Sequence, residues 1–339
     1  MPGLSATTAA TEACSRDLHE SVCLAPGPDR ASAPLGARPR RLRGGRLVAF
    51  PTETVYGLGA NALDERAVHQ VFLVKGRPSD NPLIVHLASA DQLDTVARDV
   101  SELAGRLAAR YWPGPLTRVL DARDDVPLVT RAGRATVAVR VPAHDLALQL
   151  LVAAGVPVAA PSANRSGRPS PTTAQHVRDD LGDDVDLVLD GGPCPVGLES
   201  TVVDARGDVP VVLREGTVSA AELGAVAGTA PQLGASPGTR HRHYAPRCRV
   251  VIAPAGEGPG VATANAADGA RVALVATGAA PAGVLPLAQP RGAPELGRRL
   301  YAPLREAEDA GVDVVVVEAV PEVEVGRAVM DRLRRAAGG

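Results

Sequence analysis

Residues 47–87 read LVAFPTETVYGLGANALDERAVHQVFLVKGRPSDNPLIVHL. The stretch begins with a short apolar strand at 47–52, and Asp64 is the expected N-cap of the helix that follows. Apolar residues at 67, 68, 71 and 72 share one face of this helix, which ends at Lys75-Gly76-Arg77-Pro78. A second strand is expected at 83–87. This alternation of strand and helix is typical of an α/β protein.

The loop after this helix is rich in groups that bind anions. It begins with Lys75, the only lysine among the 36 Lys and Arg residues of the chain. Because arginine is used everywhere else, we expect position 75 to need an ammonium, which is a compact charge on a flexible stem. Lys75, Arg77 and the amide of Asn81 form a cationic loop suited to phosphate oxygens. The alternative is a solvated helix C-terminus that carries favourable cations.

A second candidate anion site lies in the predicted strand ATVAVRV at 135–141. Thr136, Ala138 and Arg140 share one face of this strand. Burying an arginine is costly unless it is paired, so we expect Arg140 to face an anion. The alternative is an edge strand with Arg140 in solvent.

A third cluster, PSANRSGRPSPT at 161–172, is dense in hydroxyl, amide and guanidinium donors, which suit phosphate and ribose. It follows a predicted buried strand at 156–161 and precedes a predicted helix at 172–182. Ligands of open α/β sheets bind at the carboxyl ends of strands, which favours a site here over a flexible surface loop. Arg214 ends another predicted strand, at 209–214.

Composition excludes several classes of protein. The net charge of −2 argues against broad adhesion to nucleic acid or membrane, and the few aromatic residues provide no stacking platform for single-stranded RNA. No apolar run approaches the roughly 20 residues of a membrane span. Cys14, Cys23, Cys194 and Cys248 form no C-x-x-C pair, which favours a reducing compartment, so we expect a cytoplasmic protein without structural zinc.

The chain length allows two domains. We predict a disordered tail at 1–43, a catalytic domain at 44–227, a linker at 228–247 and a small α/β domain at 248–339. The glycines at 256, 258 and 260 miss the dinucleotide fingerprint and are assigned to a loop, and the chain has no P-loop motif. Further helices are expected at 90–99, 101–111, 144–155, 219–227, 296–310 and 325–337, and further strands at 186–190, 200–204, 248–253, 271–277 and 312–320.

These clusters describe a pocket that holds a polyphosphate without a P-loop. The sequence offers no nucleophile with an attendant base, because G-x-S-x-G is absent and no cysteine lies in an obvious pair with histidine. A site made of donors fits phosphoryl or nucleotidyl transfer, in which catalysis is mostly positioning and neutralisation of charge. The residues by themselves therefore indicate a nucleotide-handling α/β enzyme, without naming the acceptor.

Seven ordered motifs resemble the YrdC-type L-threonylcarbamoyladenylate synthases. They are FPTETVYGLGANA, KGRPSDNPLIVH, YWPGPLT, TVAVRVP, APSANRSGRPSPT, ESTVVDA and LREG. The SPG…HYAP linker and the trailing α/β domain resemble the long, two-domain form of this family. The resemblance implies a YrdC-like twisted open mixed sheet with flanking helices, followed by a smaller Rossmann-like parallel α/β domain. The linker at 228–247 would then fold over the active site.

The resemblance implies a nucleotidyltransferase that forms threonylcarbamoyl-AMP and pyrophosphate from ATP, L-threonine and bicarbonate. The product would pass to a tRNA threonylcarbamoyl transferase for threonylcarbamoyladenosine modification beside the anticodon. Mg²⁺ would enter with ATP, with no protein residue assigned to a metal. Lys75 and Arg77 would be catalytic, and they would disperse charge on the phosphorus and on the departing pyrophosphate.

The resemblance also assigns the substrate contacts. Threonine would contact Thr54, His86, Arg140, Ala160 through its backbone, and Ser200. ATP would contact Arg77, Asn81, Thr136, Ser162, Asn164, Ser170 and Arg214, with Tyr244 of the linker closing over it. Arg140 suits a carboxylate, which it can grip through two parallel hydrogen bonds. One departure is His241, where relatives often carry tyrosine, so the contacts of the linker are expected to differ there.

Two competing interpretations remain. A carbamoyl-transfer enzyme of hydrogenase maturation shares the YrdC-like domain, but it would need zinc-finger modules and the chain has no C-x-x-C. A module that binds double-stranded RNA or tRNA could use the concave basic face of the same fold. The near-zero net charge and the predicted pocket for an amino acid argue against this as the main role.

Overall fold

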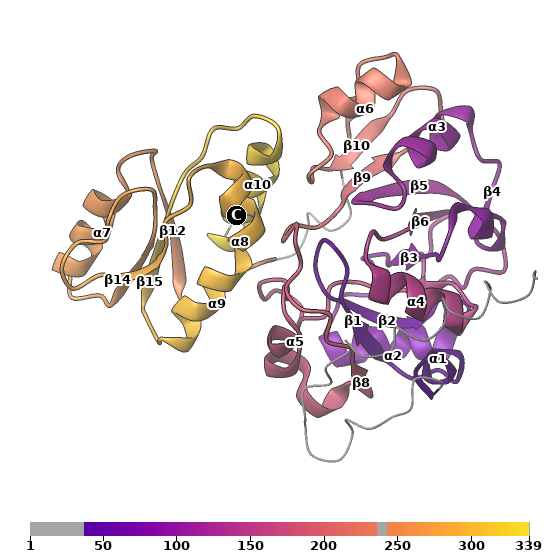
Figure 1. Cartoon of the computed structure of the whole chain (residues 1–339), viewed down its shortest axis with the longest axis horizontal. Helices are drawn as coiled ribbons and strands as arrows, with labels where there is room; N and C mark the ends of the chain where they lie inside the picture. The colour runs from indigo at the N-terminus through magenta and orange to yellow at the C-terminus, as the bar shows by residue number, and fades with distance from the viewer. Residues whose placement is uncertain (1–36, 236–242, 339) are drawn as a thin grey trace, which may run out of the picture.

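The computed structural model describes residues 37–235 and 243–338. Figure 1 shows two sheet-containing units side by side, an N-terminal domain (residues 37–235) and a C-terminal domain (residues 243–338). The N-terminal domain contains α1 (Ala37–Arg43), β1 (Val48–Phe50), β2 (Gly57–Asn61), α2 (Glu65–Lys75), β3 (Ile84–His86), η1 (Ala90–Thr95), β4 (Ala97–Arg98), α3 (Glu102–Tyr111), β5 (Leu116–Ala122), β6 (Thr136–Arg140), α4 (Asp145–Ala154), β7 (Val158–Ala159), α5 (Ala174–Leu181), η2 (Gly182–Asp184), β8 (Leu187–Val188), β9 (Thr201–Asp204), β10 (Val211–Arg214), α6 (Ala220–Ala227) and β11 (Gln232–Leu233).

The N-terminal domain is built on one mixed sheet in the order β11-β10-β9-β5-β6-β3-β7-β2-β1-β8, with β4 paired to β5. The pairs β3·β6 and β5·β9 are parallel, and β5·β6 and β2·β7 are antiparallel. This confirms the predicted mixed sheet with flanking helices. Since β6 lies inside the sheet, the edge-strand alternative for Arg140 is wrong.

Helix α2 forms where its sequence predicts it. The Asp64 carboxylate accepts hydrogen bonds from the backbone N–H groups of Arg66 and Ala67, which have no partner inside the helix. The four apolar residues of the predicted face are buried. Gly76 ends the helix with φ of 60°, a left-handed conformation that glycine adopts without strain. Lys75 and Arg77 therefore stand on either side of a sharp change in chain direction.

Three expectations for the N-terminal domain are wrong. Residues 37–43, predicted to be disordered, form α1, and Leu42 is fully buried against α4 and β1; residues 1–36 lie outside the described range. The expected helix at 90–99 is a short 3₁₀ helix followed by strand β4. The segment predicted as linker from residue 228 contains β11, which extends the sheet beside β10.

The C-terminal domain contains β12 (Arg249–Ala253), α7 (Gly258–Ala267), β13 (Val272–Val275), β14 (Leu285–Ala288), α8 (Ala293–Arg299), α9 (Tyr301–Asp309), β15 (Val314–Glu318) and α10 (Val325–Ala336). Its strands form a parallel sheet in the order β12-β15-β13-β14, as predicted for a small α/β domain. The residues 258 and 260, assigned to a loop, instead begin α7. The single helix expected at 296–310 is two helices that meet at Leu300.

The two domains share apolar packing. Leu198 and Val55 belong to the N-terminal domain, but they lie in the core formed by α8, α9, α10 and the C-terminal sheet. Leu198 is fully buried, and Gly297 on α8 packs directly against it. The loop that carries Leu198 also carries Glu199 and Ser200, so this contact fixes a site loop against the C-terminal domain. No helix within the described ranges is long and apolar enough to cross a membrane.

Candidate active site

A cavity of about 370 Å³ lies between the strand ends of the N-terminal domain and α10 of the C-terminal domain. It collects side chains from segments that are far apart in the sequence. Nearly all of the predicted site residues line it: Thr54, Arg77, Asn81, His86, Thr136, Arg140, Ala160, Ser162, Asn164, Ser170, Ser200, Arg214 and Tyr244. The exception is Lys75.

One end of the cavity is organised around Arg140. Its Nη1 donates to Thr54 Oγ1 at 2.8 Å, its Nε donates to the Gly114 carbonyl at 3.1 Å, and its Nη2 pairs with Glu53 Oε1 at 2.6 Å. The guanidinium has five N–H donors, so two remain after these contacts. Arg140 is thus held in a fixed orientation and keeps donors for a bound anion.

His86 lies beside Arg140 because the two residues are directly paired in the register of β3 and β6. Burial, together with the nearby charge of Arg140, lowers the pKa of His86 to about 3. The imidazole is therefore neutral near pH 7. Nδ1 of His86 lies 3.2 Å from the carbonyl oxygen of Ile84. In the neutral tautomer that donates to this oxygen, Nδ1 carries the proton and Nε2 is an acceptor.

The other part of the cavity contains further cations. Arg77 is held by the carbonyls of Asn81 and Pro82, at 3.2 Å and 3.1 Å. Burial lowers the pKa of Arg77 to about 10, so the side chain stays charged at neutral pH. Arg214 donates from Nη2 to the carbonyl of Ser200 at 2.8 Å and to its Oγ at 3.1 Å. The arrangement suits a ligand that carries several negative charges.

Asn164 leaves an acceptor in the cavity wall. Its Nδ2 donates to the carbonyls of Arg165 and Arg168 at 2.7 Å and 3.0 Å, which fixes the orientation of the amide. Its Oδ1 is buried and has no hydrogen-bond partner within the described part of the chain. This oxygen is thus an unsatisfied buried acceptor, which is costly to the folded chain.

Lys75 does not line the cavity. Its side chain is buried, and its Nζ donates to the carbonyl of Ser162 at 2.6 Å and to that of Asn164. Burial, assisted by the charge of Arg77, holds the pKa of Lys75 well below its ordinary value. Lys75 therefore lies behind the loop that carries Ser162 and Asn164. From this position its side chain does not reach the cavity, so the structure does not show the predicted contact between Lys75 and the phosphorus of a nucleotide.

Three described residues of the predicted linker, Ala235, His243 and Tyr244, line the cavity, and Tyr244 makes ring contacts with the C-terminal domain. Its ring stacks on Tyr301 with centroids 5.5 Å apart, and the guanidinium of Arg332 lies 5.7 Å from its centroid. Both partners belong to the C-terminal domain. His241 and the rest of 236–242 lie outside the described residues, so the predicted fold of the linker over the site is described only at its ends.

Several cavity residues were missed by sequence reasoning. Glu199 lines the cavity, but in its motif, ESTVVDA, only the neighbouring Ser200 was predicted to bind substrate. Arg134, Arg206 and Arg335 also line it. Arg335 lies on α10, far along the chain from LREG at 213–216, the last motif of the N-terminal domain, so no local pattern connects it to the site. Within the described ranges, no group of three or more His, Cys, Asp and Glu residues could hold a metal ion.

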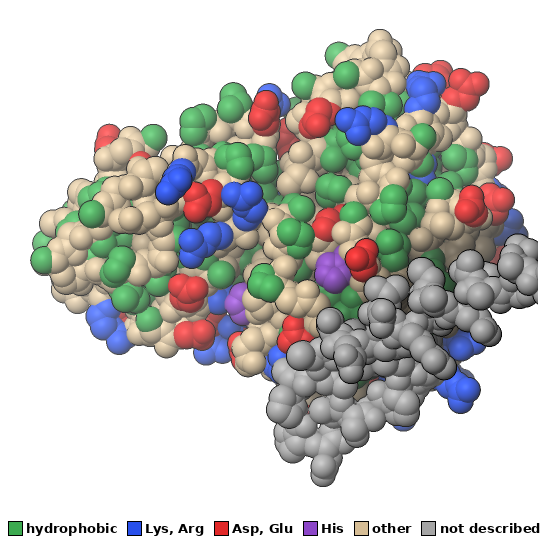
Figure 2. Space-filling view, viewed as in Figure 1, with side chains coloured by type: hydrophobic (Ala, Val, Ile, Leu, Met, Phe, Trp, Pro, Cys, Tyr) green, Lys and Arg blue, Asp and Glu red, His purple; other side chains and the backbone are tan. Residues whose placement is uncertain are grey.

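The surface provides no broad basic face in the view of Figure 2. Lys and Arg side chains alternate there with Asp and Glu side chains. The face in this view does not favour binding through a phosphate backbone, which requires clustered positive charge.

Two family models match the chain. Residues 40–216 match the Sua5/YciO/YrdC model, described as "Telomere recombination", and residues 211–338 match the Sua5 C-terminal model, described as "Threonylcarbamoyl-AMP synthase, C-terminal domain". The chain belongs to the Sua5/YciO/YrdC family. The second match extends this membership to the two-domain Sua5 arrangement.

Curated Sua5 relatives are similar over nearly their whole length. The threonylcarbamoyl-AMP synthase of Pyrococcus abyssi is 44% identical over 317 residues, which cover 88% of this chain and 92% of the relative. The synthase of Bacillus subtilis is 42% identical over 88% of this chain and 91% of its own. The crystal structure of P. abyssi Sua5 complexed with L-threonine has a TM-score of 0.85 at 42% identity, covering 89% of this chain and 94% of that chain. The fold expected from the sequence is confirmed.

Proposed function

We propose that this chain is an L-threonylcarbamoyladenylate synthase. The reaction consumes ATP, L-threonine and bicarbonate, and it yields threonylcarbamoyl-AMP and pyrophosphate. The observation that carries this proposal is the single cavity that contains both the Arg140 cluster and the Arg77 and Arg214 cations. The relatives named threonylcarbamoyl-AMP synthase support the same function.

The Arg140 end of the cavity suits threonine. The two remaining N–H donors of Arg140 bind the carboxylate, and Thr54 and Ser200 offer hydroxyl groups for the polar side chain. His86 is neutral, so it adds no positive charge beside the threonine ammonium. The backbone of Ala160 lines the same end. A small zwitterion is thereby oriented with its amine toward the rest of the cavity.

The cationic part of the cavity suits ATP. Arg77 and Arg214 counter the charge of the triphosphate, and Asn81, Thr136, Ser162, Asn164 and Ser170 supply further polar contacts. Mg²⁺ enters as part of the nucleotide substrate, since its usual ligands are phosphate oxygens and water. Tyr244 closes this side of the cavity from the linker.

Two bond-forming steps follow from this placement. The threonine ammonium gives a proton to bicarbonate, which breaks down to carbon dioxide and water. The free amine then adds to this carbon dioxide and loses a second proton to solvent, which gives a carbamate. A carbamate oxygen then attacks the α-phosphorus, the bond from that phosphorus to the bridging oxygen of pyrophosphate breaks, and pyrophosphate leaves. The protein positions the reactants and neutralises the developing charge, which is the main contribution in phosphoryl transfer. The chain is accordingly a nucleotidyltransferase without a covalent enzyme intermediate.

The product is a reactive mixed anhydride, so it needs an acceptor enzyme. We propose that it passes to a tRNA threonylcarbamoyl transferase, which modifies adenosine beside the anticodon. A cytoplasmic location is part of the same proposal.

Pyrophosphate release tests the proposal. Purified full chain with Mg·ATP and bicarbonate should release pyrophosphate when L-threonine is added and should stop when threonine is omitted. Turnover independent of threonine would contradict the assigned amino-acid substrate. Salt-sensitive binding of tRNA without any turnover would favour the RNA-binding alternative instead.

A further inference from the structure

The C-terminal domain holds one side of the cavity through buried polar contacts. The first involves Glu199, whose Oε2 lies 3.1 Å from Nε of Arg332 on α10. The hydroxyl of Tyr301 on α9 lies 2.9 Å and 3.0 Å from the two oxygens of the same carboxylate. Arg332 and Tyr301 are fully buried. A C-terminal cation and a C-terminal hydroxyl therefore fix the position of an N-terminal carboxylate.

Glu199 in turn holds Ser170. The hydroxyl of Ser170 donates to Glu199 Oε1 at 2.6 Å. Burial raises the pKa of the Glu199 carboxyl, but Arg332, Arg214 and Ser170 outweigh this effect and hold the pKa below its ordinary value. The carboxylate is therefore charged at neutral pH and can only accept hydrogen bonds. The proton of the Ser170 hydroxyl points to Glu199, which leaves the oxygen lone pairs for other partners.

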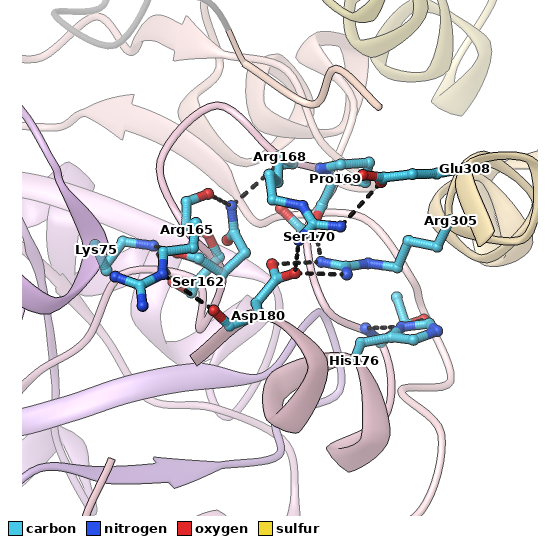
Figure 3. A network of polar contacts seen from close by, with 12 residues as sticks. Lys75, Ser162, Arg165, Arg168, Pro169, Ser170, His176, Asp180, Arg305 and Glu308 are labelled. Carbon is cyan, nitrogen blue, oxygen red and sulfur yellow. Dashed lines mark hydrogen bonds and ion pairs between the residues drawn. The ribbon is translucent and has the colours of Figure 1, made fainter. Parts of the chain in front are cut away.

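A second anchor holds the residue before Ser170 (Figure 3). Arg305 on α9 forms two parallel contacts with the Asp180 carboxylate, at 3.0 Å and 2.9 Å, and it also donates to the carbonyl of Pro169. Arg168 bridges the same carboxylate, at 2.8 Å, to Glu308 on α9, at 2.9 Å. Asp180 and Arg305 are buried, and paired charges of this kind impose a specific geometry.

Ser170 thus lies between two anchors from the C-terminal domain. We propose that Tyr301, Arg305 and Arg332 are positioning residues that set the affinity of the site for nucleotide by holding Ser170 in place. The inference rests on the proposed function, because Ser170 is assigned there to ATP. It gives the C-terminal domain a direct role in substrate binding rather than a role confined to stability.

The threonine end also has support within the N-terminal domain, although Ser200 directly follows Glu199 in the loop that packs on the C-terminal domain. Ser200 is held by Thr117, whose Oγ1 lies 2.7 Å from Ser200 Oγ, and by Arg214, and both belong to the N-terminal domain. Arg140 is held by Thr54 and Glu53, again within the N-terminal domain. Because Arg140 does not depend on the C-terminal anchors, loosening these anchors should weaken nucleotide binding much more than threonine binding.

Tyr301→Phe is the least disruptive test, because it keeps the ring that stacks on Tyr244 and removes only the hydroxyl at Glu199. Arg305→Lys and Arg332→Lys keep the charge and lose the planar fork. Tyr111→Phe and Arg334→Lys are matched controls, because Tyr111 lies on α3 and Arg334 pairs with Glu322 at the surface. Binding is measured by calorimetry with α,β-methylene-ATP and, separately, with L-threonine.

We expect each of the three variants to raise the dissociation constant of α,β-methylene-ATP roughly tenfold, as the loss of one hydrogen bond to a charged group allows. Threonine affinity should change less than twofold, and the controls should match wild type. Unchanged nucleotide affinity in Tyr301→Phe and in the folded lysine variants would overturn the inference. So would an equal loss of nucleotide and threonine affinity, since that indicates a general structural effect.

The same experiment separates this inference from the proposed function. Wild type that releases pyrophosphate with threonine, combined with variants that bind nucleotide normally, rejects only the positioning role. Wild type that binds neither α,β-methylene-ATP nor threonine rejects the proposed function, and the positioning role with it.

Discussion

Nη2 of Arg140 lies 2.6 Å from Oε1 of Glu53, and both side chains are almost completely buried. Arg140 is thus paired with Glu53 inside the protein before any substrate arrives. A buried ion pair contributes little net stability, but removal of one partner leaves an uncompensated charge. The pair serves to hold the guanidinium that we assign to the threonine carboxylate.

Arg140→Ala should abolish threonine-dependent turnover and lower the free energy of unfolding by about 3–5 kcal/mol, because Glu53 is left unpaired. The double variant Arg140→Ala/Glu53→Gln should regain part of this stability and none of the activity. Urea denaturation and pyrophosphate release measure the two effects. Turnover in the double variant would remove Arg140 from threonine binding.

Lys75→Met should lower the free energy of unfolding by roughly 2 kcal/mol, because the carbonyls of Ser162 and Asn164 lose their donor. Turnover should fall with it, and amide hydrogen exchange at 162–166 should become faster. Arg66→Met, on the exposed side of the same helix, is the control. Full stability combined with lost turnover would mean instead that the ammonium acts directly on the substrate, as the sequence suggested.

Burial of His86 should make the free energy of unfolding depend on pH. Its pKa is about 3 in the folded chain and about 6.5 when unfolded, so below pH 6.5 the unfolded state binds a proton that the folded state does not. This contribution to stability is complete above pH 6.5 and is lost as the pH falls. Between pH 7 and pH 5.5 the loss from His86 should be about 1 kcal/mol.

Urea denaturation at both pH values checks this dependence. His86→Gln should lose about 1 kcal/mol less stability than wild type over this range. His69→Gln changes an exposed histidine on α2 and should behave like wild type. An identical pH dependence in His86→Gln and wild type would contradict a neutral, buried imidazole.

Tyr244→Leu should raise the KM for ATP about tenfold, because it removes the ring that stacks on Tyr301 at the nucleotide side of the cavity. The KM for threonine should stay within twofold.

A protease site introduced at 236–242 allows the covalent connection between the two domains to be cut, and we expect cutting to lower turnover sharply. A cut chain with wild-type turnover would make this segment a plain tether.

Much of the site could be predicted because its donors stand at the ends of strands and helices. Asp64 and Gly76 bound α2 by local capping, which depends only on nearby residues. Arg140 is expensive to bury without an anion, so its position in an apolar strand indicated an anionic partner, and the structure provides one in Glu53. The resemblance to the family then assigned some of these hydrogen-bond donors to threonine and the others to ATP.

The direction of Lys75 and the domain contacts could not be predicted in this way. Whether the Lys75 ammonium points into the cavity or behind its loop depends on tertiary packing. Glu199 and Arg332 are 133 residues apart, and no sequence period connects them. Helix α7 begins in a segment rich in glycine and proline, where packing against β13 and β15 overrides weak local preference.

The most direct test of the central claim is a crystal structure of the full chain with α,β-methylene-ATP and L-threonine bound together. We expect the threonine carboxylate to lie at Arg140 and the triphosphate to lie at Arg77 and Arg214, within one cavity. Electron density for the two ligands in separate cavities, or threonine away from Arg140, would contradict this expectation.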